Sequence, residues 1–521
     1  MKQFESISIR KPKSSVFNLS HERKLTMSMG DLVPIFCEEV LPGDKFRVNT
    51  EVLMRLQPMI APVMHRMNAY VHYFFVPNRL IWNDWEKFIT GGRLGQDTPV
   101  FPVIQGQSDD AKNTGLMGVG SLADFFDIPV QMIGSGSHPM MPISQMPFRA
   151  YQRIYNEYYR DQNLEEELVI PSDSSPLGYD EPEVAVLLKL RKRAWEKDYF
   201  TSALPFAQRG DEVLLPLQGD APVSGHVRWS TATGLAATAN VRASGGTLQE
   251  GESPYESMFI SDNTTGLVNP IHADLSEASA TSISELRRAF ALQRWLEKMA
   301  RGGSRYVEQM LYMFGVRSSD ARLQRSVYLG GGKLPIQISE VLQTSKTDTS
   351  PQGNMSGHGF TAGVTNGFKK YFEEHGLVIG ILSVIPRTGY MQGMPKLLTK
   401  TDRFDYYWPD FAHIGEQEVK KYELYYNPAL STNNDTFGYQ PRYAEYRYKF
   451  DKVNGEMRTS LKQWHMANDY SAQPSLNNSF VKANPTTRIF AVESPDWHKL
   501  IVDIYFDFKA IRPVAKYGEP I

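Results

Sequence analysis

Two segments near the ends of the chain alternate between apolar and polar residues over most of their length. In residues 46–57 every second position carries an apolar side chain or a threonine, and mainly polar residues stand between them. Residues 500–508 repeat the pattern with Leu500, Val502, Ile504, Phe506 and Phe508. Because successive side chains of a strand point to opposite faces, each segment is predicted to be a strand with one buried face.

Two further segments, residues 69–76 and 377–385, are apolar at both alternate positions. This pattern is typical of a central strand that is covered on both sides. Strands near both termini, with others between them, suit a sandwich in which the first and last strands are neighbours. We therefore predict a mainly β protein, an eight-stranded antiparallel jelly-roll sandwich with long loop insertions and a few short helices.

A helical period replaces the strand pattern in residues 282–314. Ser282 and Glu285 form a capping box, and Gly302 and Gly303 end the first helix, whose apolar arc holds Leu286, Ala289, Phe290, Leu296 and Met299. Ser304 is a suitable cap for a second helix that ends before Gly315, with Val307, Met310, Leu311 and Phe314 at helical spacing. Two short helices are predicted here.

Three consecutive glycines precede Lys333, which raises the question of a phosphate-binding loop. That motif needs a glycine where Val327 stands and a serine or threonine where Leu334 stands. We therefore predict that residues 330–332 form a tight glycine turn with an exposed lysine. Ile336 and Ile338 then alternate with polar residues behind Pro335, as in a strand.

Eight strands of ordinary length use only about 50–80 residues, so most of the 521 residues must lie in loops and insertions. The candidate insertions are residues 91–146, rich in Gly, Pro and Met, and residues 210–280, rich in Gly, Ser, Thr and Ala. A disordered linker is one interpretation of the second segment. A folded surface module is favoured because the segment has some apolar mass, namely Leu214, Leu215, Val227, Trp229, Tyr255 and Phe259.

Charge is distributed unevenly along the chain. The net charge is −2, but residues 211–280 hold nine acids against Arg228 and Arg242, so this segment carries −7 and the rest carries +5. Residues 1–30 hold six lysines or arginines against two acids. The overall balance excludes a uniformly basic nucleic-acid binder and leaves local basic segments as candidates.

The cysteine and the histidines form no catalytic or metal-binding pattern in the sequence. The single cysteine, Cys37, has no base placed beside it in the sequence and is predicted to be a buried structural thiol. The eleven histidines show no metal-ligand spacing. We expect no cofactor, no metal, no export signal and no membrane insertion.

Two segments are candidates for contact with single-stranded nucleic acid. Around residue 445, tyrosines that could stack on bases alternate with cations that could meet phosphates: Tyr439, Arg442, Tyr443, Tyr446, Arg447, Tyr448 and Lys449. An interface loop with cation–π contacts is the alternative. The basic arm of Arg10, Lys11 and Lys13 suits neutralisation of a phosphate backbone, with a solvated terminus as the alternative.

Acids and aromatic residues also mix near residue 410. Asp405, Asp410 and Glu416 stand among Phe, Tyr and Trp, as in sites that bind or hydrolyse sugars. A carbohydrate-binding or glycoside-hydrolysing jelly-roll protein is therefore the alternative function from a different class. An aromatic loop at a subunit contact has the same composition.

Four blocks of the sequence, residues 20–46, 290–345, 351–363 and 438–458, resemble the major capsid protein of the Microviridae, in particular of the gokushovirus-like phages. The resemblance implies a non-enzymatic protein of the virion, assembled in the host bacterial cytoplasm. It implies self-assembly into a small T=1 icosahedral shell around a circular single-stranded DNA genome. A small basic internal DNA-binding protein, a minor pilot protein and a host surface receptor are further partners that it suggests.

The same resemblance suggests a division of the chain. Residues 1–209 would form the N-terminal arm and the first part of the jelly-roll capsid domain, and residues 281–521 the remainder of that domain. Residues 210–280 would be a surface insertion that builds a protrusion at the threefold axes and serves host attachment. The candidates for receptor contact within it are Arg228, Trp229, Arg242 and Tyr255.

Overall fold

A computed structural model describes residues 14–107, 116–129, 140–211, 213, 223–224, 226–231, 234–240, 257–259, 272–273, 283–303, 305–348, 351–492, 494 and 497–517. The chain divides into two compact units. One consists of Met1–Ala207 together with Gly302–Ile521, and the other is Gln208–Arg301. Each unit is described by itself.

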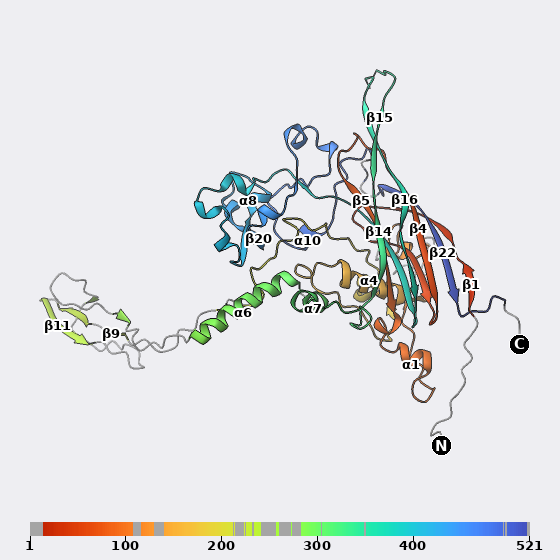
Figure 1. Ribbon diagram of the computed structural model, residues 1–521, viewed down its shortest axis with the longest axis horizontal. Coiled ribbons are helices and arrows are strands. Elements are labelled where there is room, and N and C mark those ends of the chain that lie inside the picture. The colour runs from red at the N-terminus through yellow and green to blue at the C-terminus, as the bar shows by residue number, and fades with distance from the viewer. Residues whose placement is uncertain are drawn as a thin grey trace. The chain divides into compact units, whose positions relative to one another are not determined.

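The larger unit is built on two facing antiparallel sheets (Figure 1). In the first, the order is β2 (His21–Met27), β22 (Leu500–Arg512), β4 (Lys45–Leu56) and β16 (Met355–Tyr371). β1 (Ser15–Asn18) also pairs with β22, and β15 (Gln337–Leu342) pairs with β16. In the second, the order is β3 (Val33–Val40), β17 (Gly376–Pro386), β5 (Met67–Pro77) and β14 (Val327–Pro335).

The strand order is that of a jelly roll. If β1 and β15 are set aside as extensions, the first sheet contains the first, eighth, third and sixth strands in chain order, and the second contains the second, seventh, fourth and fifth. Every neighbouring pair is antiparallel. The predicted fold class is confirmed, and the two terminal segments meet as predicted because β22 lies between β2 and β4.

The core between the sheets follows the alternation in the sequence. In β4 and β22 the predicted inward residues are all buried, from Phe46 to Leu56 and from Leu500 to Phe508. Aromatic rings of the two sheets pack against each other. The ring centres of Phe36 in β3 and Phe508 in β22 are 5.4 Å apart, and those of Tyr73 in β5 and Phe368 in β16 are 5.1 Å apart. Burial of these apolar side chains is the main force that holds the sandwich together.

The second sheet is covered on both faces, which explains the two segments that are apolar at both alternate positions. Its outer face packs against α4 (Met146–Ile154), where Phe148, Tyr151 and Ile154 share a buried cluster with Phe74 and Ile379. Residues 69–76 and 377–385 therefore bury nearly all their side chains. The prediction of two central strands is confirmed.

The glycines at positions 330–332 do not form a turn, and that prediction was wrong. They lie inside β14, with a register shift between Tyr328 and Gly330. A Cβ atom on Gly331 would stand 2.3 Å from the carbonyl oxygen of Val71 on β5, so the two backbones approach too closely for a side chain. Lys333 is exposed, as predicted.

Both predicted helices are present as α6 (Ile283–Gly302) and α7 (Tyr306–Phe314). Gly303 and Gly315 have left-handed backbones, with φ of 89° and 68°, and each follows a helix end. Ser282 and Ser304 lie outside the described residues, and Arg305 is the N-cap of α7. No residue of α7 is buried within this chain.

Two long insertions interrupt the sandwich. The first, between β5 and β14, contains the predicted insertion at residues 91–146 and the following elements of the larger unit: η1 (Asn78–Leu80), α1 (Trp85–Thr90), β6 (Val103–Gln105), α3 (Leu122–Phe125), β7 (Ile143–Ser144), α4, the π-helical turn η3 (Tyr155–Tyr159), β8 (Leu177–Gly178), α5 (Pro182–Leu187) and α7.

The second insertion, between β17 and β22, contains β18 (Gly389–Tyr390), η4 (Lys396–Thr399), η5 (Arg403–Asp405), η6 (Pro409–Phe411), β19 (Glu416–Lys420), α8 (Lys421–Leu424), η7 (Ser431–Asn434), β20 (Thr436–Pro441), α9 (Ala444–Arg447), β21 (Asp451–Lys452), η8 (Gly455–Arg458), η9 (Lys462–Trp464) and α10 (Asn478–Val481). Its Tyr390 and Phe437 share a buried cluster with Phe200 of the first insertion.

The smaller unit contains short strands and α6. Its strands are β9 (Val223–Ser224), β10 (His226–Thr231), β11 (Gly234–Asn240), β12 (Ser257–Phe259) and β13 (His272–Ala273). β10 pairs with both β11 and β12, and β9 pairs with β13. The pairing of β9 with β13 brings Ser224 opposite His272, so the chain enters and leaves the three-stranded part at neighbouring points.

Candidate functional site

The tyrosine-arginine segment follows β20, and the structure divides its residues into two groups. Tyr443 is buried at the start of α9 in a left-handed conformation, where its hydroxyl donates to the backbone oxygen of Tyr406 at 3.3 Å. Arg442 is half-buried beside the rings of Phe411 and Tyr443. Tyr439 is half-buried in β20 and exchanges backbone hydrogen bonds with Leu204. These three side chains take part in local packing.

The other four candidates, Tyr446, Arg447, Tyr448 and Lys449, are exposed side by side in α9 and just after it. The ring of Tyr446 covers the ammonium of Lys400 at 4.4 Å. Lys400 also pairs with Glu445 at 3.0 Å. Burial alone would lower the pKa of Lys400, but the hydrogen bonds to Tyr446 and Glu445 outweigh it and the pKa is raised, so the charge is kept.

More aromatic side chains are exposed in the neighbouring loop. Four of them present about half of their surface to solvent: Phe404, Tyr406, Tyr407 and Trp408. The ring centres of Tyr407 and Tyr446 are 6.2 Å apart. We call these four residues, together with Tyr446 and Tyr448, the aromatic patch. Exposed aromatic groups of this density are typical of interaction surfaces.

The acids of this region lie in three separate elements. Asp405 of η5 accepts hydrogen bonds from the backbone nitrogens of Asp402 and Thr401 at 2.9 and 3.0 Å, and these bonds lower its pKa. Asp410 is exposed in η6, and Glu416 is half-buried in β19.

Several candidates cannot be placed. Arg10, Lys11 and Lys13 lie outside the described residues, as do Arg242 and Tyr255. The backbones of Arg228 and Trp229 lie in β10, opposite Phe259 and Met258 of β12.

Burial keeps two further titratable groups, Cys37 and His72, in their neutral forms. Burial raises the pKa of the Cys37 thiol to about 12, so it stays protonated, as expected of a structural cysteine. His72 donates to or accepts from the hydroxyl of Tyr159 at 2.8 Å, and burial lowers its pKa to about 4. In the part of the chain that the structure describes, no three His, Cys, Asp or Glu side chains gather as a metal site would require.

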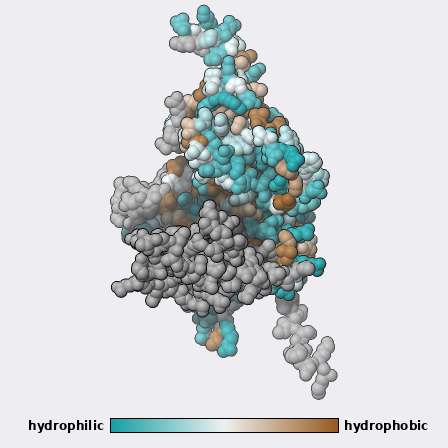
Figure 2. Space-filling model, turned by 90° about the vertical axis from the view of Figure 1, so that its left-hand side faces the viewer, coloured by the Kyte–Doolittle hydropathy of each residue, from teal (hydrophilic) through white to brown (hydrophobic). Residues whose placement is uncertain are grey.

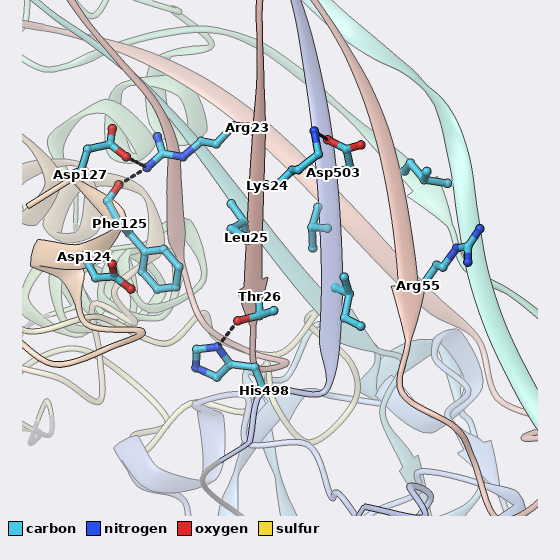
Figure 3. A pocket seen from close by; sticks show the side chains of 13 residues that line it. Arg23, Lys24, Leu25, Thr26, Arg55, Asp124, Phe125, Asp127, His498 and Asp503 are labelled. Carbon is cyan, nitrogen blue, oxygen red and sulfur yellow. Dashed lines mark hydrogen bonds and ion pairs between the residues drawn. The ribbon is translucent and has the colours of Figure 1, made fainter. Parts of the chain in front are cut away.

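A groove of about 670 Å³ lies at the β2 edge of the first sheet, where residues of β2 and outer-face residues of β22 and β4 meet α3 and Asp127 (Figure 3). Two of its cations have acidic partners. Arg23 binds Asp127 at 2.9 Å and donates to the backbone oxygen of Phe125 (Figure 3). Lys24 lies 2.7 Å from Glu22 and 3.4 Å from Asp503.

Sequence reasoning missed a second group of cations on this same outer face. Strand pairing places Lys369 of β16 opposite Arg47 of β4, and Arg47 opposite Lys509 of β22. All three are exposed. They are separated by hundreds of residues in the chain, so only the strand register could have identified them.

Comparison with known proteins identifies the family. A family model described as "Capsid protein (F protein)" matches residues 5–521. The chain belongs to this phage capsid protein family. It is 37% identical over 596 aligned residues to capsid protein VP1 of Chlamydia phage 1, with 99% of this chain and 97% of that protein covered.

Two further relatives agree. Capsid protein VP1 of Bdellovibrio phage phiMH2K is 37% identical, with 97% of this chain and 95% of that protein covered. Capsid protein VP1 of Spiroplasma virus 4 is 33% identical, with 98% of this chain and 95% of that protein covered. The resemblance to the gokushovirus-like Microviridae is confirmed, and the chain is a capsid protein of the virion with a structural rather than enzymatic role.

No helix among the described residues is long and apolar enough to cross a membrane.

Proposed function

We propose that this capsid protein assembles with copies of itself into a T=1 icosahedral shell, that the shell encloses a circular single-stranded DNA genome, and that residues 210–280 form an outward insertion for host attachment. The observation that carries the proposal is the jelly-roll core interrupted by two long insertions. A fixed core with long loops can supply several different contacts from one chain, as a closed shell requires.

Exposed apolar side chains support self-assembly. On α7, Phe314 is 79% exposed and Leu311 is 52% exposed. The hairpin of β15 and β16 continues beyond the other strands of the sandwich (Figure 1) and exposes Val341, Leu342 and Met355. On the face seen in Figure 2, hydrophobic residues of the described part occur in small groups among hydrophilic ones. Such divided contacts suit a subunit that meets several neighbours.

Two features support contact with single-stranded DNA. The exposed residues Tyr446, Arg447, Tyr448 and Lys449 combine rings with cations. The basic arm of Arg10, Lys11 and Lys13 precedes β1, whose Asn18 pairs with Lys509 at the basic end of the first sheet. A small basic internal protein and a minor pilot protein would share the genome-facing side.

Charge and composition support an outward position of the insertion. Residues 211–280 carry −7 while the rest of the chain carries +5, so the acidic segment would be repelled by packaged DNA. Arg228, Trp229, Arg242 and Tyr255 are the proposed receptor contacts within it.

Assembly and genome content can be tested on one preparation. The expressed protein should form particles of uniform size with icosahedral symmetry by cryo-electron microscopy, and sixty copies per particle by mass measurement would establish T=1 symmetry. Particles from infected cells should protect circular single-stranded DNA from nuclease. A stable small oligomer without DNA would contradict the proposal.

A further inference from the structure

Three cations form a row across the first sheet of the sandwich. Lys369, Arg47 and Lys509 are directly opposite one another on three adjacent strands, and all three are exposed. Five of their six neighbours along the strands are buried: Phe46, Val48, Phe368, Phe508 and Ala510. Because side chains alternate between the faces of a sheet, the three cations lie on the outer face, and three strands at about 4.8 Å spacing place them within ~10 Å. We call them the basic row.

The basic row is unfavourable for the isolated subunit. Like charges directly opposite on paired strands destabilise a sheet. Among the described residues, neither Arg47 nor Lys369 forms an ion pair. One acid in the adjacent row, Asp507, lies 3.8 Å from Lys509 and also accepts from Asn49 at 3.3 Å. Within the described part of the chain, the three cations therefore have one ion pair between them.

The next row toward the end of the sheet extends the positive surface. Lys45 is opposite Tyr371 on one side and Ile511 on the other. Its ammonium lies 5.8 Å from the centre of the Tyr371 ring, which is half exposed. A fourth cation and an accessible ring thus adjoin the basic row.

The other end of the same face provides a comparison within one molecule. There, Lys24 of β2 lies beside Glu22 and Asp503, and Arg23, which projects from the opposite face of the same strand, is bound to Asp127 (Figure 3). These two cations have acidic partners, whereas the basic row holds three like charges with one ion pair among the described residues. A multiply charged anion is the ligand that would relieve the second arrangement.

We propose that the basic row binds the sugar-phosphate backbone of single-stranded DNA, and so makes this end of the outer sheet face a genome-contacting surface of the capsid. The inference rests on the proposed function, since it presupposes a shell that encloses DNA. The row presents ammonium and guanidinium groups, which contact phosphates, so the binding is independent of sequence. Tyr371 supplies a surface on which one base can stack.

The test replaces the row without changing the core. In the triple variant Arg47→Gln, Lys369→Gln and Lys509→Gln, binding to a fluorescent oligothymidylate is measured over a range of salt concentrations on assembled, DNA-free particles. Loss of three phosphate contacts should lower the slope of log K against log salt by about 2, since each contact contributes about 0.7 for single strands. A control with the same charge change, Lys189→Gln, Lys333→Gln and Lys346→Gln, should keep the wild-type slope.

Two further measurements distinguish loss of DNA binding from loss of folding. The triple variant should unfold at the same temperature as the wild type or a higher one, because it removes repulsion between like charges. The conservative variant Arg47→Lys should retain the wild-type salt slope. An unchanged slope in the triple variant would overturn the inference.

The proposed function is tested independently of the basic row. Wild-type particles that contain no DNA would refute genome enclosure, whatever the basic row does. If instead the triple variant fails to assemble while its unassembled subunits bind DNA as wild-type subunits do, the partner of the row is an acidic surface of a neighbouring subunit, and the inference is wrong while the shell remains.

Discussion

Adjacent residues of one strand have opposite roles in this capsid protein. In β22, Ile504 has no exposed surface, whereas Tyr505 is 39% exposed. Ile504 faces Val52 across the strand pair and belongs to the core between the sheets. Neighbouring positions should therefore differ sharply in their tolerance of substitution.

Ile504→Asp should prevent the protein from accumulating in soluble form. It places an unpaired carboxylate in the core, at a cost of about 4 kcal/mol or more. Tyr505→Ser should change the free energy of unfolding by only about 1 kcal/mol, since it removes a half-exposed side chain. Soluble yield and urea unfolding measure both effects, and equal behaviour of the two variants would show that the faces of β22 are assigned wrongly.

Histidines whose pKa is lowered by burial give the subunit a pH-dependent stability. Burial, and to a lesser degree the charge of Arg193, lower the pKa of His72 from 6.5 to about 4. Between these values the unfolded chain binds a proton that the folded chain does not, so stability falls as the pH falls from 6.5 to 4. His65 and His465, whose pKa burial also lowers, act in the same direction.

His72→Gln should remove part of this dependence, because glutamine can still bond to Tyr159 but does not titrate. Relative to the variant, the wild type should lose up to about 3 kcal/mol of unfolding free energy between pH 6.5 and 4. Denaturant unfolding at several pH values gives the difference directly. Parallel pH curves for the two proteins would mean that His72 is not held neutral in the folded state.

At the scale of the element, β14 depends on its glycines. Gly331→Ala would place a Cβ atom 2.3 Å from the backbone oxygen of Val71, which cannot move without distorting β5. We expect a loss of about 1–3 kcal/mol, the usual cost of overpacking. Gly363→Ala is the matched control, because the nearest atom to its Cβ is the flexible end of Leu334 at 3.0 Å. In thermal unfolding, the wild type and Gly363→Ala should have similar midpoint temperatures, and Gly331→Ala should have a lower one.

The same glycines mark the limit of what the sequence could predict. Alternation predicted β4 and β22 because each has one buried face, and unbroken apolar runs predicted β5 and β17 because both of their faces are covered. Residues 330–332 were wrongly predicted as a turn, since a glycine that permits close strand contact has the same local sequence as one that permits a turn. The local sequence does not show which strand a glycine will face.

The candidate sites show the same limit. The exposed group from Tyr446 to Lys449 is continuous in the sequence, so composition alone could mark it. The burial of Tyr443 depends on Tyr406 and Tyr407, which come from a separate loop. The basic row depends on the register of three strands, because a shift by one residue would move Arg47 to the core face.

At the scale of the whole molecule, the insertion and the sandwich fall in different compact units. All strands of the two sheets belong to the larger unit, and none of the buried clusters of the described residues includes a residue of Gln208–Arg301. Removal of the segment between β9 and β13 therefore takes no residue from these clusters. Because Ser224 and His272 are paired, a short linker can join the two strands.

Replacing residues 225–271 by a short Gly-Ser turn should yield a capsid protein that remains soluble and assembles but no longer attaches to its host. Loop closure changes little in free energy, since each halving of loop length alters it by only about 0.6 kcal/mol. Adsorption of particles to host cells, compared with wild type at equal particle number, measures attachment. Trp229→Ala in the full chain is the finer variant, and it should slow adsorption while assembly is unchanged. Normal adsorption by the deletion variant would contradict an attachment role, and failure of the deletion variant to fold would show that the sandwich needs the insertion.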